Sequence, residues 1–223
     1  MFYEPDKNNH GLRFNPFKSI CVPRPIAWVS SLSAGGVPNL APFSQFTNVS
    51  YDPPHVLFCP RADTDTARNI AETGEFVVNM ATFAMREAVN ATSAVVPPEI
   101  DEAALCGVTM VPSRLVRPQR VETAPTQLEC RLHSVMLVPA RLAGHGQAVI
   151  IGRVVGVHIR DDVLTPEGRI DIARIRPLAR LGYLDYTSVE SVLTMPPPDG
   201  PNAERSRRGL EGRPDMAVAA AAK

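Results

Sequence analysis

The sequence predicts a mainly β protein, an antiparallel barrel with a few flanking helices. Many short apolar runs alternate with polar residues or are rich in β-branched residues, and 22 prolines punctuate the chain against only 14 glycines. Two longer runs, 126–138 and 148–159, can pair side by side across a turn. A long antiparallel pair among many short strands is more typical of a barrel than of a sandwich.

The composition sets the bounds on function. The chain has 223 residues with 44% hydrophobic content, enough for one substantial core. Lys and Arg number 23 and balance 23 Asp and Glu, so no broad field attracts nucleic acid or an anionic membrane. No run approaches the ~20 apolar residues that span a bilayer, and the N-terminus lacks a signal-peptide pattern. We therefore expect a cytoplasmic protein without membrane or nucleic-acid partners.

The four cysteines are scattered, with no CxxC pair and no cluster of His or Asp beside them. This pattern predicts buried, reduced thiols and no metal site. With a neutral chain and no metal, any bound anion must be held by a few placed donors.

The stretch 24–54 is the first strong structural signal. An alternating run, 26–32, leads through a turn at 33–36 into a second extended run at 37–41, which predicts a β-hairpin. We expect the hydroxyl- and amide-rich segment 44–50 to be a polar loop, stiffened by neighbouring prolines. Hydroxyl groups at strand ends can present donors to an anion.

The next segment predicts a buried strand at 55–59 and then a short helix at 67–74 that ends at Gly74. The start of this helix carries partial positive charge, and Arg61 lies just upstream. Two interpretations stay open here. The helix start is a seat for a phosphate, or Asp65 or Thr66 merely caps the helix and Arg61 is a solvated charge.

The rest of the chain continues the mixed pattern. We expect a strand at 75–80, a helix from Thr82 to about Ala94, a helical piece at 100–105 and short extended runs over 108–116. In the long strand 126–138, alternate residues form an apolar face and a polar face. His158 lies in the second long strand without an evident partner. We expect one domain over 1–195 and a tail over 196–223, rich in Pro, charge and Ala, that is disordered or rests on another surface.

Four stretches resemble, in order, the conserved blocks of the flavin reductase-like, FMN-binding split-barrel family. They are RPIAWVSSLSAGGVPNLAPFSQFTNVSYDPPHV, DTARNIAETGEFVVNM, GRVVGVHIRDDVL and PLARLGYLDY. The resemblance runs from about residue 14 to 192. It implies a six-stranded antiparallel Greek-key barrel flanked by helices, a homodimer, and FMN bound in a groove near the dimer interface.

The resemblance also implies which residues hold FMN. The phosphate and ribityl side would be lined by Arg24, Trp28, Ser30 and Ser31, the isoalloxazine ring by Ala41, Pro42, Phe43, Ser44 and Asn48, and the phosphate end by Arg61, Asp65 and Thr66. Trp28 has an equal alternative in the core or an interface. Tyr183 or Tyr186 would approach the ring, and Tyr183 stands where the family often has a second glycine. A phosphate needs charge-assisted donors, which favours the anion interpretation of the helix start.

The activity that the resemblance implies is an NAD(P)H-dependent flavin oxidoreductase, with NADH or NADPH as a transient co-substrate. No GxGxxG follows a strand, so the nicotinamide would bind at the flavin itself. Reduced flavin would serve oxygen or a partner monooxygenase. The cofactor carries the redox chemistry, so no catalytic acid, base or nucleophile is assigned. The alternatives are an oxidase or oxygenase of the pyridoxamine-oxidase-like type and a non-enzymatic FMN-carrying electron-transfer module.

Overall fold

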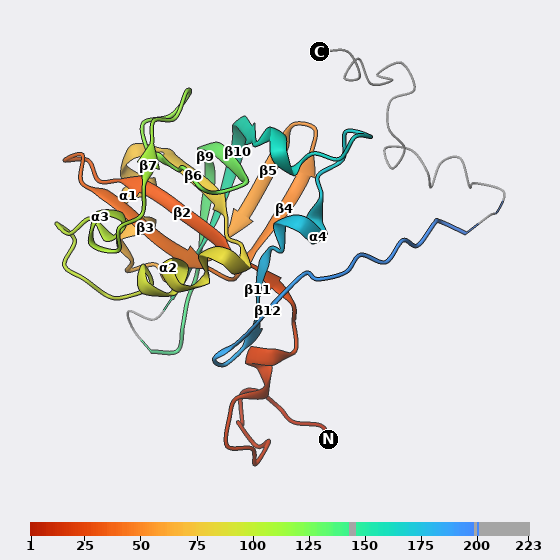
Figure 1. Cartoon of the computed structure of the whole chain (residues 1–223). Helices are drawn as coiled ribbons and strands as arrows, with labels where there is room; N and C mark the ends of the chain where they lie inside the picture. Colours follow the sequence, from red (N-terminus) through yellow and green to blue (C-terminus); the bar gives the residue numbers. More distant parts are fainter. Residues whose placement is uncertain (143–145, 199, 201–223) are drawn as a thin grey trace.

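The structure, a computed structural model, describes residues 1–142, 146–198 and 200 (Figure 1). The strands are β1 (Arg24–Pro25), β2 (Ala27–Leu32), β3 (Pro38–Phe43), β4 (Phe46–Tyr51), β5 (Pro54–Phe58), β6 (Glu75–Met80), β7 (Met110–Val111), β8 (Arg120–Val121), β9 (Thr126–Val138), β10 (Gln147–Ile159), β11 (Leu178–Gly182) and β12 (Asp185–Ser188). The helices are α1 (Asp65–Thr73), α2 (Arg86–Ala91), α3 (Glu102–Leu105) and α4 (Ile172–Ile175), with 3-10 turns η1 (Pro16–Ser19), η2 (Phe83–Met85) and η3 (Asp161–Val163).

The main sheet has seven antiparallel strands in the order β3-β2-β6-β9-β10-β5-β4. Its two edge strands, β3 and β4, follow each other in the chain with only Ser44 and Gln45 between them. Consecutive Cα atoms are 3.8 Å apart, so the end of β3 and the start of β4 lie within about 11 Å. The sheet must therefore curl until its edges approach.

No ladder joins β3 to β4 in the part of the chain that the structure describes, so the curled sheet is not a closed barrel. The predicted mainly β class with flanking helices is confirmed. The predicted count of six strands is not confirmed, because the curled sheet has seven.

The core inside the curl is aromatic and aliphatic. Phe58 and Phe76 are fully buried, with ring centroids 5.6 Å apart, and Ile150 and Cys130 pack in the same cluster. The Phe76 ring reaches this position because residue 152 is glycine. A Cβ at Gly152 would lie 2.2 Å from Cζ of Phe76. One of the two register shifts between β9 and β10 falls at the same glycine, as expected where a backbone approaches a bulky ring.

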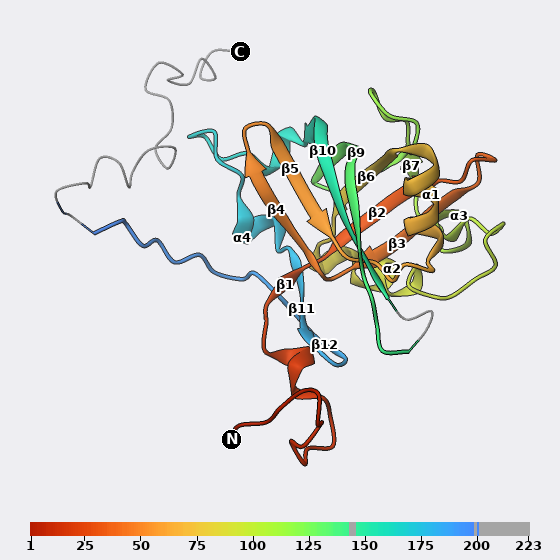
Figure 2. The same cartoon turned by 180° about the vertical axis from the view of Figure 1, so that it is seen from behind.

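The strand β2 is buried on both of its faces. Ala27 and Val29 belong to the core inside the curl, whereas Trp28 belongs to a second cluster beneath the helices, with Leu40 and Val89. Helices α2 and α3 pack on this second cluster, whereas α1 packs on the core inside the curl. All three helices lie on the side of the molecule away from β4 and β5 (Figures 1 and 2). The hydroxyl groups of β2 therefore lie in a protein interior.

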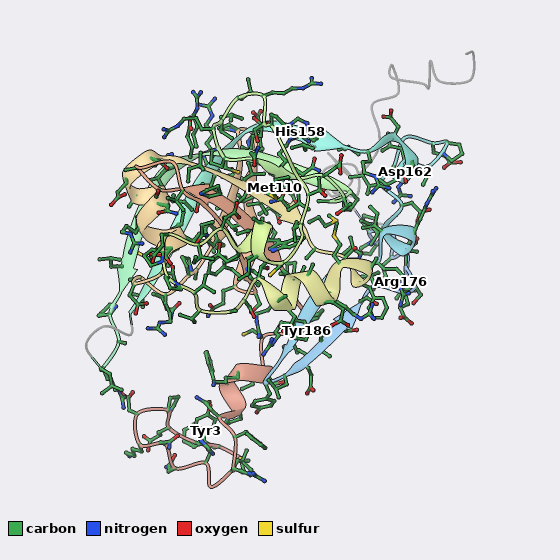
Figure 3. All side chains as sticks on the ribbon, turned by 60° about the vertical axis from the view of Figure 1, so that its left-hand side comes forward. Tyr3, Met110, His158, Asp162, Arg176 and Tyr186 are labelled. Carbon is green, nitrogen blue, oxygen red and sulfur yellow. The ribbon has the colours of Figure 1, made fainter. Side chains whose placement is uncertain are left out.

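The N-terminal segment and the small sheet β1-β11-β12 project from the main sheet (Figures 1 and 2). Figure 3 shows Tyr3 on this segment, away from Met110 and His158 in the body of the molecule. No helix in the described residues is long and apolar enough to cross a membrane.

Several predicted elements are confirmed, including the 26–41 hairpin, the helix ending at Gly74 and the strands at 75–80 and 126–138. The helix predicted to run to about Ala94 ends at Ala91. The polar loop predicted at 44–50 is wrong, because most of it forms β4. This strand lies at the sheet edge with Thr47 and Asn48 exposed, so its polar residues are explained by contact with solvent and do not indicate a loop. Most of the predicted tail, 196–223, lies outside the described residues.

Candidate functional site

A cavity of about 270 Å³ lies between β3, the start of α1 and the segment 92–96. We call it the β3–α1 cavity. It brings together six of the residues predicted to hold FMN: Ala41, Pro42, Phe43, Arg61, Asp65 and Thr66. Their meeting depends on the fold, because β3 and the start of α1 are separated in the chain by the β4–β5 hairpin.

The start of α1 forms one wall of this cavity. Thr64 is the N-cap residue, and its hydroxyl accepts a hydrogen bond from the Ala67 amide at 3.3 Å. Asp65 and Thr66, which the sequence offered as caps, lie instead in the first turn of the helix. First-turn amides have no partner within a helix and carry partial positive charge, so this wall suits an anion.

Thr66 is held rigidly at this wall. It is buried, and its hydroxyl accepts a hydrogen bond from Nδ2 of Asn39 on β3 at 2.8 Å. This bond ties the first turn of α1 to the edge strand and fixes the width of the cavity. Asn39 was not among the predicted site residues.

Arg61 is the only basic residue among the described residues that line the cavity, and it is half exposed. Its guanidinium pairs with Asp63, which lines the same cavity. On the other side of the helix start, Asp65 pairs with Arg68, one turn along α1. The guanidinium of Arg61 is close enough to solvent to exchange this partner for a ligand anion at small cost.

A buried carboxylate, Glu102, also lines the cavity. It is the first residue of α3, it is 6% exposed, and its Oε2 accepts a hydrogen bond from the Leu40 amide at 2.9 Å. That amide points away from the sheet at the free edge of β3. Burial raises the pKa of Glu102, the Leu40 amide and its own amide oppose this, and the charges of Asp65 and Asp101 raise it further. The net pKa is above the ordinary range.

The structure separates Ser30 and Ser31 from this cavity. Both are buried in β2, and the Ser30 hydroxyl donates to the Gln119 carbonyl at 2.5 Å, whereas Ser31 accepts from Asn69 at 3.3 Å. They line a different cavity, which borders the start of β3. Trp28 is 1% exposed and donates through Nε1 to Thr92 at 2.9 Å, a core position that matches its alternative interpretation.

Arg24 and Ser44 line a second cavity of about 400 Å³, beside η1 and β11, which we call the β1–β11 cavity. The family resemblance implied a place for Arg24 on the phosphate side, but in the structure Arg24 lines the same cavity as Ser44. Arg24 donates to the carbonyls of Lys18 and Cys21, at 3.3 and 2.7 Å. Asn48 lies on β4, exposed and opposite Val56, away from the β3–α1 cavity.

Tyr183 lines the β1–β11 cavity, whereas Tyr186 stacks against Arg180 and lines a separate groove beside Phe83. The backbone of Tyr183 has φ of 46°, in the left-handed region that favours glycine. The glycine that the family resemblance implies at this position would adopt this backbone conformation without strain. The Tyr183 hydroxyl donates to the Asn15 carbonyl at 3.1 Å, so the ring anchors the N-terminal segment.

A second buried carboxylate corrects the expectation for His158. Glu129 is fully buried, and its carboxylate accepts from the amides of Arg114 and Leu115, at 2.8 and 2.6 Å. Nε2 of His158 lies 2.6 Å from the same carboxylate. Alternation had placed Glu129 on the polar face of a half-buried strand, but the loop after β7 covers that face.

Sequence reasoning missed Glu102 and the wall formed by 92–96. The sequence signal for Glu102 was limited to Asp101, whose side chain caps α3 through the Ala103 and Ala104 amides. No local pattern pairs Glu102 with Leu40, because 62 positions separate them. In the described residues, no group of three or more His, Cys, Asp or Glu side chains is placed to hold a metal ion.

Comparison with known proteins gives a consistent result. The model of the flavin reductase like domain family matches residues 19–183. A protein of Aquifex aeolicus is 34% identical over 172 residues, which cover 75% of this chain and 85% of that protein.

Solved structures are similar over most of the chain. Component B of a nitrilotriacetate monooxygenase from Bacillus cereus has a TM-score of 0.80 and 28% identity, covering 87% of this chain and 98% of its own. The 2-nitrobenzoate 2-nitroreductase NbaA of Pseudomonas fluorescens has a TM-score of 0.77 and 26% identity, covering 89% and 96%. A Shewanella frigidimarina protein with a split barrel domain, 21% identical with a TM-score of 0.76, shares the fold and covers 89% and 100%.

Proposed function

Because the chain belongs to the flavin reductase-like family, we propose that it binds FMN in the β3–α1 cavity and works as a flavin oxidoreductase. The observation that carries the proposal is the convergence, in one cavity, of a helix start, a guanidinium and an apolar strand segment. These are the groups that a phosphate and an aromatic ring require.

The residues present fit FMN at its phosphate end. Arg61 can bind a phosphate as a two-pronged donor, and the first-turn amides of α1 can donate single hydrogen bonds. The cavity is slightly smaller than most ligand pockets, which start at roughly 300 Å³. It therefore suits the phosphate and ribityl chain better than the whole cofactor.

The segment Ala41–Ser44 offers a path for the remainder. Phe43 lines the β3–α1 cavity and Ser44, its neighbour in the chain, lines the β1–β11 cavity, so this segment borders both hollows. Pro42 fixes the backbone of that path and presents an apolar wall without a donor. We propose that the ring lies along this segment, with Arg24 near the ring rather than near the phosphate.

When bound, FMN supplies the electron-accepting and electron-donating chemistry, and the protein supplies position and electrostatics. The side chains of this cavity bind the phosphate, stiffen β3 and keep the path along Ala41–Ser44 in one geometry. We propose NADH or NADPH as the reductant. No Rossmann-type glycine motif follows a strand, so the nicotinamide would meet the flavin directly.

The names of two similar proteins suggest where the electrons go. The Bacillus cereus protein is a monooxygenase component, which favours delivery of reduced flavin to a partner monooxygenase. The Pseudomonas fluorescens protein is a nitroreductase, which favours direct reduction of a nitroaromatic compound. We also propose a cytoplasmic homodimer. The β9–β10 ribbon exposes Val135, Met136, Leu137 and Val138, an apolar surface that a second copy can cover.

An anaerobic titration tests this function. Protein loaded with FMN is mixed with NADH or with NADPH, and the flavin absorbance is followed. Bleaching by either reductant is the expected result. Bound FMN that neither reductant bleaches would contradict the reductase proposal and favour the oxidase or carrier alternatives. Reoxidation by a nitroaromatic compound rather than oxygen would select the nitroreductase alternative.

A further inference from the structure

The β3–α1 cavity has a charge balance that is unusual for a phosphate site. Its lining residues include three carboxylates, Asp63, Asp65 and Glu102, against one guanidinium, Arg61. Even when Arg68 is counted with Asp65, the ionised groups carry a net charge of about −1 by simple addition. A phosphate monoester adds a further charge of about −1.5 to −2 at pH 7.

Two of these carboxylates, Asp65 and Asp63, form ion pairs with arginine side chains. Asp65 pairs with Arg68, which does not line the cavity, and Asp63 pairs with the half-exposed Arg61. Both are near solvent, so water screens them. Their charges do not prevent an anion from binding.

Glu102 differs because it is buried without a cationic partner among the described residues. Its carboxylate accepts a hydrogen bond from the Leu40 amide, and the charged groups near it are Asp65 on α1 and Asp101 on its own helix. In the described part of the chain, the other lining elements, β3 and the segment 92–96, bring no titratable side chain to the cavity. Of the described lining residues, only Arg61 opposes its charge across the hollow.

We propose that Glu102 takes up one proton from solvent when the cavity binds the phosphate of FMN and releases it when FMN leaves. This inference rests on the proposed function. The protonated carboxyl group keeps its carbonyl oxygen as acceptor for the Leu40 amide, so neutralisation does not disturb the edge of β3. It removes a buried negative charge that a phosphate dianion would meet in a poorly screened setting.

Burial and two neighbouring acids already raise the pKa of Glu102 in the free protein, so the proton is taken up at modest cost. A dianion nearby raises this pKa further, because it disfavours the ionised form. Linkage then requires that FMN affinity falls as pH rises through the interval between the two pKa values, at most about tenfold per pH unit for one proton.

The test is the dissociation constant of FMN from about pH 5.5 to about pH 9 for the wild type, Glu102→Gln and Glu99→Gln. Above about pH 7 the phosphate is already a dianion, so further weakening comes from the protein. The amide in Glu102→Gln keeps an acceptor for the Leu40 amide and mimics the protonated acid, whereas Glu99 is an exposed carboxylate of the same segment.

The expected result is that wild type and Glu99→Gln lose affinity relative to Glu102→Gln as pH rises, because the phosphate of FMN titrates equally for all three proteins. At a pH above both pKa values of Glu102, in the bound and in the free protein, Glu102→Gln should bind FMN roughly tenfold more tightly than the wild type, which corresponds to a difference of about one between those two values. Parallel pH profiles for wild type and Glu102→Gln would overturn the inference alone. Absence of FMN binding at every pH would overturn the proposed function, and the inference with it.

A second measurement uses the wild type only, in case Glu102→Gln does not fold. Calorimetric titrations at several pH values, each in two buffers of different ionisation enthalpy, count the protons taken up on binding. We expect FMN to bring in up to about half a proton more than riboflavin, which lacks the phosphate, because a difference of about one between the bound and free pKa values of Glu102 allows no more. Equal proton uptake for the two ligands at every pH would overturn the coupling.

Discussion

Glu102 and Glu129 are two buried carboxylates at different places in one fold, and the structure shifts their pKa values in opposite directions. Their exposed fractions are 6% and 0%. Burial alone would raise both pKa values. The Glu102 pKa is raised, but that of Glu129 lies below its usual range, because hydrogen bonds from the Arg114 amide, His158 and the Leu115 amide outweigh burial.

The difference teaches how donors decide the role of a buried acid. The Glu129 carboxylate is hydrogen-bonded to two loop amides and to the His158 imidazole, which together stabilise its charge. These bonds hold the loop after β7 against β9 and β10. The Glu102 carboxylate accepts a hydrogen bond from only one backbone amide, that of Leu40 in β3, and it lines a cavity together with other acidic side chains. The first arrangement stabilises the fold, and the second leaves a charge that a ligand can influence.

The largest expected effect is on stability. Glu129→Ala removes the acceptor for two amides and an imidazole and should lower the free energy of unfolding by about 3–5 kcal/mol, the scale of a broken buried pair. Glu102→Ala leaves the Leu40 amide without its hydrogen-bond acceptor and should lower the free energy of unfolding by only about 1–3 kcal/mol. Urea denaturation of both variants at one protein concentration measures this. Equal losses of unfolding free energy in the two variants would contradict the different roles assigned to the two acids.

The next effect is on FMN affinity. Arg61→Ala in the β3–α1 cavity should weaken FMN binding by about 1.5–3 kcal/mol, the scale of hydrogen bonds to charged groups. His158→Gln, beside Glu129, should leave the affinity unchanged, because it lies outside the cavity. Fluorescence titration of FMN gives both values. If His158→Gln weakened FMN binding as much as Arg61→Ala does, the assignment of FMN to the β3–α1 cavity would be contradicted.

A smaller effect is the pH dependence of stability, which has opposite signs for the two acids. Glu102 has a raised folded pKa, so its ionisation lowers stability as pH rises from its unfolded value, about 4.5, through the folded one. Glu129 has a lowered pKa, so its contribution is present above about 4.5 and is lost as pH falls through the folded pKa.

Unfolding free energies of Glu102→Gln and Glu129→Gln across pH separate these signs. Relative to wild type, Glu102→Gln should gain stability as pH rises above about 4.5, whereas Glu129→Gln should lose it over acidic pH. A pKa that differs by one between the folded and unfolded states changes the free energy of unfolding by about 1.4 kcal/mol, which urea denaturation resolves. Curves for the two variants that shift in the same direction would contradict the assigned environments.

The smallest effect concerns the tail. Removing residues 196–223 should change Tm by no more than about 2 °C, which corresponds to about 0.5–1 kcal/mol for a chain of this size. Both acids and their partners lie before Ser188, where β12 ends. Differential scanning calorimetry of the truncated chain checks this, and a large fall in Tm would show that the tail supports one of the two regions.

Local signals in the sequence were enough for much of the fold. Gly74 has φ of 72° and closes α1 as its position predicted, and the alternation over 126–138 matches β9. The same logic failed at 44–50, where polar residues on an edge strand resemble a loop. The alternation of apolar and polar residues reveals a strand only when one face is buried and the other is exposed. An edge strand is exposed to water on more than one side, so this alternation is lost.

The candidate site was predictable only in part. Arg61 and the α1 start came from local signals, and the structure brings them to Ala41–Phe43. Ser30 and Ser31 looked like exposed donors because no local pattern shows that helices cover the second face of β2. The partners of Glu102 and Glu129 are 62 and up to 29 positions away, so only tertiary packing reveals them.

The most direct test of the site is a double-mutant cycle that removes the phosphate and Arg61 separately and together. Dissociation constants are measured for FMN and for riboflavin with wild type and with Arg61→Ala. If the β3–α1 cavity holds the phosphate, wild type should prefer FMN, and Arg61→Ala should lose most of that preference, a coupling of about 1.5–3 kcal/mol. An FMN-to-riboflavin ratio that Arg61→Ala leaves unchanged would place the phosphate elsewhere and contradict the proposed site.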